Sequence, residues 1–226
     1  MNLTDAMSTL RAVRRLRPDP IPDDVLGRLL QAATWAPSGG NAQAWRIIVV
    51  KDPETKKALA DLYRPAWDEY LAQGRAIRTP ESAEKAQDAG KSSDAAQRMV
   101  KAGQHLAEHM HEAPVLLVFC FDPRRMAFTD AEQNRPSVTG GASLYPAVQN
   151  LMLACVEAGI GCTLTTLHCK HEPEVKRLLG IPEEWGTSAL VPLGYPVGRG
   201  HGPITRAPAE QMVHAERFGE AWSTAG

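Results

Sequence analysis

The chain has 226 residues, of which 43% are hydrophobic and 23% are charged, and its formal net charge is −1. This length buries a sizeable core without disulfides or metals and favours one α/β domain over two small ones. A near-neutral charge gives no reason to expect nucleic acid or an anionic membrane as partner. No apolar run reaches the length of a membrane span, and the first twenty residues lack an apolar signal core, so we expect a cytoplasmic protein.

The first half of the chain alternates helical and strand patterns. It predicts a helix at 3–16 that ends in a basic cluster, a helix from Pro22 to just before Ala36, a strand at 45–50, and a helix from Asp52 to about Ala72. Residues 73–93 then lose their apolar periodicity, which indicates either a mobile loop or a loosely packed helical insert.

The second half predicts three strands and three helices. The strands are at 114–121, 162–167 and 188–194, and the helices are at 93–110, 141–158 and 173–179. The helix at 141–158 is apolar almost all round, so we expect a core or a subunit interface to cover it. A long loop at 122–138 has little structure of its own, and such loops are often functional.

The four cysteines are Cys120, Cys155, Cys162 and Cys169, and none of them forms a C-x-x-C pair. We expect most of them to be reduced core residues. The histidines and cysteines between 162 and 171 do not have the spacing of a tetrahedral zinc site, so no metal is expected.

A basic cluster at Arg11, Arg14 and Arg15 is the first candidate for binding chemistry. On a helix, position 11 shares a face with 14 or 15, and two guanidiniums aimed at one point make a phosphate clamp. The alternative is a solvated basic helix end, and spacing alone favours that alternative.

Three further motifs are each weak alone. The loop APSGGNAQAW at 36–45 offers a hydroxyl and two amides to a planar ring, but it also fits a plain helix-to-strand turn. The run GIGCTLTTL at 159–167 follows a helix, so it is not the dinucleotide fingerprint. Arg206 by itself predicts only a surface charge.

The order of these motifs resembles that of the nitroreductase family of flavoproteins. The resemblance rests on RAVRRLRPDPIPDDVLGRLLQAATWAPSGGNAQAWRIIVV, on GGASLYPAVQNLMLACVEAGIGCTLTT, and on Arg206-Ala207-Pro208 near the end of the chain. It implies an α+β fold with a central, mostly antiparallel sheet flanked by helices, in an intertwined homodimer. It also implies one FMN-binding domain over 1–226, with a variable insert or lid region at 73–138 and a C-terminal arm at 195–226.

Carried over residue by residue, the resemblance implies an FMN site. Arg11, Arg14 or Arg15, and Arg206 would hold the phosphate, with Ala12 in the place of a serine that is frequent in the family. The residues that would line the flavin, some of them from the partner subunit, are Pro37, Ser38, Asn41, Gln43 and Ser143. The residues that would pass its reactive edge, where a backbone N–H approaches N5, are Leu164, Thr165, Thr166 and Leu167. Ala44 replaces the usual proline.

The resemblance also implies an oxidoreductase that uses NADH or NADPH to reduce a small nitroaromatic or quinone-like acceptor by a ping-pong mechanism. Flavin carries the hydride chemistry, so no catalytic side chain is expected. Tyr63, Trp67 and Tyr70 are candidates for a substrate lid, and core packing explains their helical spacing equally well. The alternatives are a reductive dehalogenase, an enzyme that fragments the flavin with oxygen, and a non-catalytic flavin store or sensor.

Overall fold

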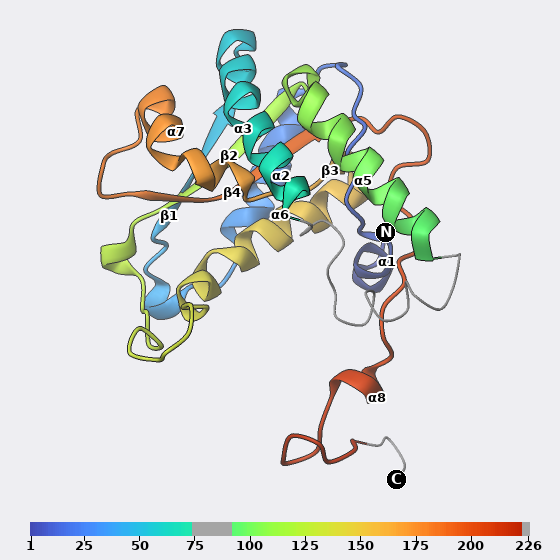
Figure 1. Cartoon of the computed structure of the whole chain (residues 1–226), viewed down its shortest axis with the longest axis vertical. Coiled ribbons are helices and arrows are strands. Elements are labelled where there is room, and N and C mark those ends of the chain that lie inside the picture. Colours follow the sequence, from blue (N-terminus) through green and yellow to red (C-terminus); the bar gives the residue numbers. More distant parts are fainter. Residues whose placement is uncertain (74–91, 223–226) are drawn as a thin grey trace.

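The computed structural model describes residues 1–73 and 92–222 and is built on a four-stranded antiparallel sheet (Figure 1). The strands β1 (Trp45–Val50), β2 (Val115–Phe121), β4 (Gly186–Gly194) and β3 (Gly161–Cys162) lie side by side in that order. In the middle of the sheet, Val118 lies opposite Ile48 on β1 and Leu190 on β4. The fold is therefore α+β, as the sequence predicted.

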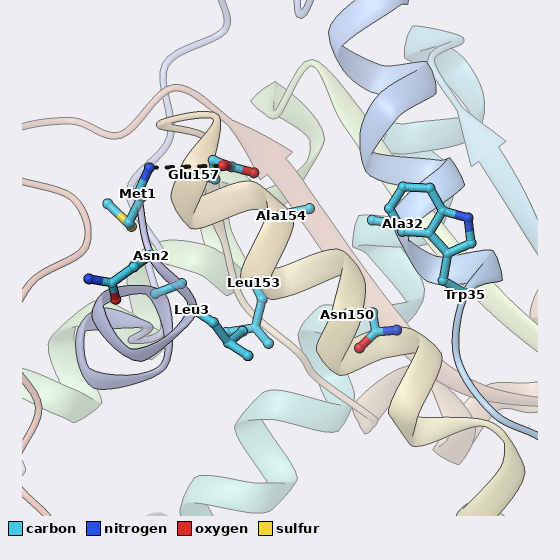
Figure 2. A pocket seen from close by; sticks show the side chains of 10 residues that line it. Met1, Asn2, Leu3, Ala32, Trp35, Asn150, Leu153, Ala154 and Glu157 are labelled. Carbon is cyan, nitrogen blue, oxygen red and sulfur yellow. Dashed lines mark ion pairs between the residues drawn. The ribbon is translucent and has the colours of Figure 1, made fainter.

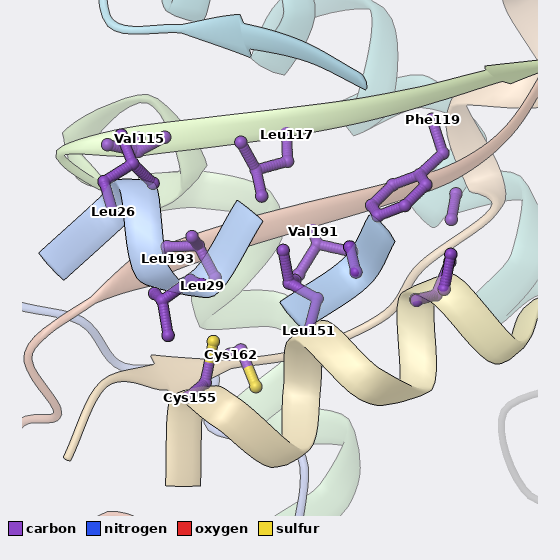
Figure 3. Packing of buried hydrophobic residues seen from close by; sticks show 14 of the residues in the cluster. Leu26, Leu29, Val115, Leu117, Phe119, Leu151, Cys155, Cys162, Val191 and Leu193 are labelled. Carbon is purple, nitrogen blue, oxygen red and sulfur yellow. The ribbon is translucent and has the colours of Figure 1, made fainter. Parts of the chain in front are cut away.

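Helices cover both faces of this sheet because its two central strands are apolar on both sides. On one face, Leu117 and Phe119 pack with Leu29 of α2 (Asp23–Thr34) and Leu151 of α6 (Tyr145–Glu157), as Figure 3 shows. The helices on the other face are α3 (Pro53–Ala72), α5 (Ser92–His109) and α7 (Glu172–Leu179). Leu116 is one of the β2 residues that point to that face.

The predictions for α2, α3, α5 and α7 and for β1, β2 and β4 are confirmed to within about two residues. The prediction for 73–93 falls almost entirely outside the described residues. None of the helices within the described ranges has the length and apolarity needed to cross a bilayer. All four cysteines are free thiols, and three of them are buried.

The predicted helix at 3–16 is wrong beyond Thr9. Helix α1 spans Leu3–Thr9, and the chain after it runs extended. There the N–H of Val13 donates to the carbonyl of Cys162 at 2.8 Å, and the N–H of Arg17 donates to that of Tyr195 at 2.7 Å. These pairings replace helical bonds in a stretch where three nearby arginines would repel one another on a helix.

Two further boundaries differ from the prediction. The strand predicted at 162–167 pairs only through Gly161–Cys162 and an isolated bridge from Thr165 to Leu190, and a 3-10 helix begins at Leu167. The helix predicted from 141 starts at Tyr145, with a 3-10 segment at Thr139–Ser143 before it. Pro146 fits the first turn of α6, where no N–H is needed.

Residues after Tyr195 return along the N-terminal segment and then leave the body of the molecule. Val197 donates its N–H to the carbonyl of Arg15 at 2.9 Å. Beyond Arg206 the chain carries α8 (Ala209–Met212) and a small turn, and it projects away from the sheet and its helices (Figure 1).

Candidate functional site

Six arginines line one open cavity of about 760 Å³, which we call the arginine pocket. It forms where the extended segment after α1 meets α5 and the segment at 197–206. The six are Arg11, Arg14, Arg15, Arg98, Arg199 and Arg206. Ala12 lines it too, so the structure brings together every residue that the sequence assigned to the phosphate. The helical geometry assumed for Arg11, Arg14 and Arg15 was wrong, because all three lie on an extended chain.

Hydrogen bonds to backbone carbonyls fix the shape of the arginine pocket. The Arg11 Nε donates to the carbonyl of Gly200 at 2.7 Å, and the N–H of Gly202 donates to the carbonyl of Thr9 at 3.0 Å. Gly198 and Gly200 have φ of +80° and +67°, a conformation that glycine adopts at little cost. The turn therefore holds Arg199 against the N-terminal segment.

The arginine pocket is cationic, and no carboxylate of the described residues neutralises it. Among the described residues, the ion pairs of arginine involve other side chains, and none joins these six to an acid. Burial lowers the pKa of Arg14, but a guanidinium stays charged in proteins. Such a group of forked donors fits a phosphate monoester, which several guanidiniums contact through paired hydrogen bonds.

The sequence interpretation did not identify Arg98 and Arg199 as residues of the site. Arg98 lies in the least patterned part of the chain, and Arg199 stands in a turn with no spacing relation to the other arginines. The Gly-x-Gly spacing on either side of Arg199 was the one available signal, because it marks a turn that brings the chain close to another segment.

A buried tyrosine contacts the segment at 164–167 and interacts electrostatically with Arg14 of the arginine pocket. Tyr63 is 2% exposed, and its hydroxyl lies 3.1 Å from Thr165 Oγ1. Burial raises the pKa of Tyr63, and the hydrogen bond with Thr165 and then the charge of nearby Arg14 oppose that shift. The N–H of Thr165 donates to Leu190, so it is not available to a ligand. Thr166, the next residue, is exposed.

The sequence left a substrate lid and core packing as two interpretations of the aromatic residues of α3. In the structure, Tyr63 and Trp67 pack in the core. Both belong to the core on the α3 side of the sheet, and Trp67 Nε1 donates to Gln104 Oε1 at 2.7 Å. Tyr70 packs against the edge of that core, with its ring centroid 5.9 Å from that of Trp67.

The loop around Ser38 forms a separate group with Ser143. The N–H of Gly39 donates to Ser143 Oγ at 3.0 Å, and the N–H of Gln43 donates to Ser38 Oγ at 3.1 Å. Asn41 and Gln43 have φ of +52° and +46°, and the side-chain amide of Gln43 donates to Asn41 Oδ1. Pro37, before the loop, is exposed. Within one chain these residues do not line the arginine pocket.

A second cavity, of about 480 Å³, adjoins Thr166, and we call it the aromatic cavity. Its rings are Phe121, Phe128 and Tyr145, and its polar lining includes Thr166, Cys169 and Ser188. All the described residues that line it are uncharged. Phe128, Ser137 and Val138 come from the long loop after β2, so this loop is one wall of the cavity.

A buried carboxylate organises that loop. Asp130 accepts hydrogen bonds from Ser137 Oγ at 2.6 Å and from the N–H of Val138 at 2.9 Å. It also accepts one from Thr139 Oγ1, and it pairs with Arg135. These donors hold the pKa of Asp130 well below its usual range. The loop thus has a fixed shape although it contains little regular secondary structure.

The Asp130 carboxylate should make stability depend on pH. Because its pKa is depressed in the folded chain, its contribution is complete above the unfolded value of about 3.9 and is lost as the pH falls toward the lower folded value. Asp130→Asn should therefore be less stable than the parent at pH 7, and the difference should shrink below about pH 4. Urea unfolding over a pH series measures this difference in stability, and Asp61→Asn, at an exposed position, is the control. A difference that stays constant down to about pH 2.5 would contradict the assignment.

Comparisons with known proteins decide the family. The model of the Nitroreductase family matches residues 9–195. The chain belongs to the nitroreductase family. An "NADH dehydrogenase" of Thermus thermophilus is 30% identical to this nitroreductase-family chain over 230 residues, covering 90% of each. A "5,6-dimethylbenzimidazole synthase" of Rhodospirillum rubrum is 29% identical over 188 residues, covering 82% of this chain and 78% of the relative.

Solved structures share the fold of this chain. The structure of an oxidised iodotyrosine deiodinase bound to FMN and 3-iodo-L-tyrosine superposes with a TM-score of 0.66 at 22% identity. The match covers 96% of this chain and 99% of the other. At that identity the match shows a shared fold. The sequence prediction of a nitroreductase-like fold is therefore confirmed.

Proposed function

We propose that this nitroreductase-family chain is an FMN-dependent oxidoreductase that takes electrons from NADH or NADPH and passes them to a small aromatic nitro or quinone-like acceptor. The observation that carries the proposal is the arginine pocket, with six guanidiniums and no carboxylate partner among the described residues. A cationic cavity of this kind fits the terminal phosphate of FMN. The relatives support the redox part, since one carries the name NADH dehydrogenase.

In this proposal each group of residues has one task. Arg11, Arg14 and Arg206 bind the phosphate, with Arg15, Arg98 and Arg199 around them. The exposed Thr166 stands at the reactive edge of the ring, and Tyr63 fixes the neighbouring Thr165. When bound, FMN supplies the hydride chemistry, so the chain needs no nucleophile of its own. The two substrates use the same face in turn, which is a ping-pong scheme.

We further propose that the chain works as a homodimer in which each subunit completes the flavin site of the other. The outer face of α6 lines an open groove with α1 and α2 (Figure 2). Leu3, Leu153 and Trp35 are among the groove residues, and Trp35 is 73% exposed. An exposed apolar surface of this kind is typical of an interaction site. In a dimer, Pro37, Ser38, Asn41, Gln43 and Ser143 would then line the partner's flavin.

The test is anaerobic reduction of the FMN-loaded protein. Addition of NADH or NADPH should bleach the flavin absorbance, and nitrobenzene added afterwards should restore it. The initial rates should give parallel lines in double-reciprocal plots, as a ping-pong scheme requires. Failure of both nicotinamides to reduce the flavin would overturn the proposed electron donor, and bound flavin with no turnover would favour the store or sensor.

The relatives also support two other candidate functions, flavin fragmentation and reductive dehalogenation. Proteins named 5,6-dimethylbenzimidazole synthase and iodotyrosine deiodinase both match most of this chain. Either function could use FMN bound at the arginine pocket, with a different reaction partner. Product analysis after reoxidation in air separates these candidates: intact FMN excludes flavin fragmentation, and halide release from a halogenated phenol would favour dehalogenation.

A further inference from the structure

We propose that the aromatic cavity binds the electron acceptor and selects neutral, flat aromatic molecules. This inference rests on the proposed function, because it places the acceptor beside Thr166, which FMN would adjoin. It assigns acceptor binding to the loop after β2, which lies in the region that the family resemblance describes only as a variable insert or lid.

The chemistry of the lining defines the ligand. At about 480 Å³, the volume of the cavity lies in the range of small-molecule sites. Phe121, Phe128 and Tyr145 offer ring faces and edges, which favour a second aromatic ring. Thr166 and Ser188 add hydroxyl groups that can bond to one polar substituent. Because the described residues that line the cavity are uncharged, a carboxylate on the ligand would lose its water without gaining a charged partner among them.

Two glycines let the rings lie against the backbone. A Cβ on Gly140 would meet the Phe128 ring at 2.2 Å, and a Cβ on Gly141 would meet the Tyr145 ring at 2.7 Å. Neither glycine needs a left-handed backbone. Their role is therefore close approach, and a methyl group at 140 must push the Phe128 ring out of its place.

The wall that carries Phe128 is fixed in advance. Asp130, two residues further along, joins that part of the loop to Ser137 and Val138, which line the cavity. A cavity with a fixed wall loses little conformational entropy when a ligand enters. Asp130 is thus a positioning residue for the cavity, and it does not itself line it.

Alkylation of Cys169 reports directly whether a ligand occupies the aromatic cavity. It lines the aromatic cavity and is partly exposed, whereas Cys120, Cys155 and Cys162 are buried. Burial raises the pKa of Cys169, so labelling is best done at alkaline pH, where more of the thiolate is present. A small alkylating reagent should then react first at Cys169, and Cys169→Ala should remove that reaction.

The experiment measures alkylation of Cys169 in the FMN-loaded protein by iodoacetamide, without any nicotinamide. Nitrobenzene is the neutral probe, and 4-nitrobenzoate is its charged counterpart. We expect saturating nitrobenzene to slow labelling at least about fivefold, and 4-nitrobenzoate at the same concentration to protect much less. Equal labelling rates with and without nitrobenzene, at a concentration that saturates turnover, would overturn the proposal.

Two substitutions make the test specific. Gly140→Ala should raise KM for nitrobenzene about tenfold and weaken the protection, with FMN affinity unchanged. Gly27→Ala is the matched control, because a Cβ there meets nothing within 4 Å. Phe128→Ala is a second variant that should also weaken protection without forcing the loop to shift. Unchanged KM and protection in both Gly140→Ala and Phe128→Ala would contradict the proposal.

Failure of this inference is distinguishable from failure of the proposed function. If the protein binds and reduces FMN but nitrobenzene never protects Cys169, the acceptor site lies elsewhere and the oxidoreductase stands. If the protein binds no FMN but nitrobenzene still protects Cys169, the proposed function fails and the cavity remains an aromatic-binding site.

Discussion

Replacing Arg14 with alanine should weaken FMN binding by roughly ten- to a hundredfold, because a hydrogen bond to a charged group contributes about 1.5–3 kcal/mol. Arg14 lines the arginine pocket, is partly buried and has no carboxylate partner among the described side chains. Its charge is thus available to a ligand. Isothermal titration of the apoprotein with FMN gives the affinity.

Arg17→Ala is the matched control for that measurement. Arg17 belongs to the same extended segment, but it pairs with Asp19 and lies over the Tyr195 ring, outside the arginine pocket. Its loss should leave FMN affinity within about twofold, since an exposed ion pair contributes little. Equal losses in Arg14→Ala and Arg17→Ala would mean that general positive charge, and not the pocket, attracts the phosphate.

Removal of residues 207–226 should abolish dimer formation and FMN binding together. Beyond Arg206 the described part of the arm leaves the body of the molecule (Figure 1) and exposes apolar side chains, with Phe218 95% exposed. Exposed aromatic residues on an ordered arm are stabilised when a second copy covers them. Size-exclusion chromatography with light scattering gives the mass, and visible absorbance gives the bound flavin.

A smaller change tests the same idea without truncation. Phe218→Ala with Trp222→Ala removes two aromatic rings from each subunit and therefore four from the dimer. Since each ring contributes about 2 kcal/mol when buried, the dimer dissociation constant should rise roughly a millionfold. Glu220→Ala, an exposed residue of the same turn, is the control. A truncated monomer that keeps full FMN occupancy would contradict a flavin site shared between subunits.

Most of the fold follows from local patterns. The apolar runs at 45–50 and 114–121 predicted β1 and β2, because strands covered on both faces must be apolar throughout. The N-terminal segment was mispredicted because its structure depends on distant partners: Val13 bonds to Cys162, and Arg17 bonds to Tyr195. Local propensity cannot anticipate such pairing.

The candidate site, too, could be predicted only in part from the sequence. Arg11, Arg14 and Arg206 were found because their order along the chain matches a known family. Arg98 and Arg199 join them only through tertiary packing. Asp130 was missed because one carboxylate in a polar loop carries no pattern, and its four partners become visible only when the loop is folded.

Binding of FMN to the arginine pocket through its phosphate is tested most directly by titration of the apoprotein with FMN and with riboflavin, which lacks the phosphate. We predict one FMN per chain and an affinity for riboflavin at least about a hundredfold weaker, with the difference shrinking as salt is added. Equal affinity for the two flavins, or no binding of either, would contradict the account.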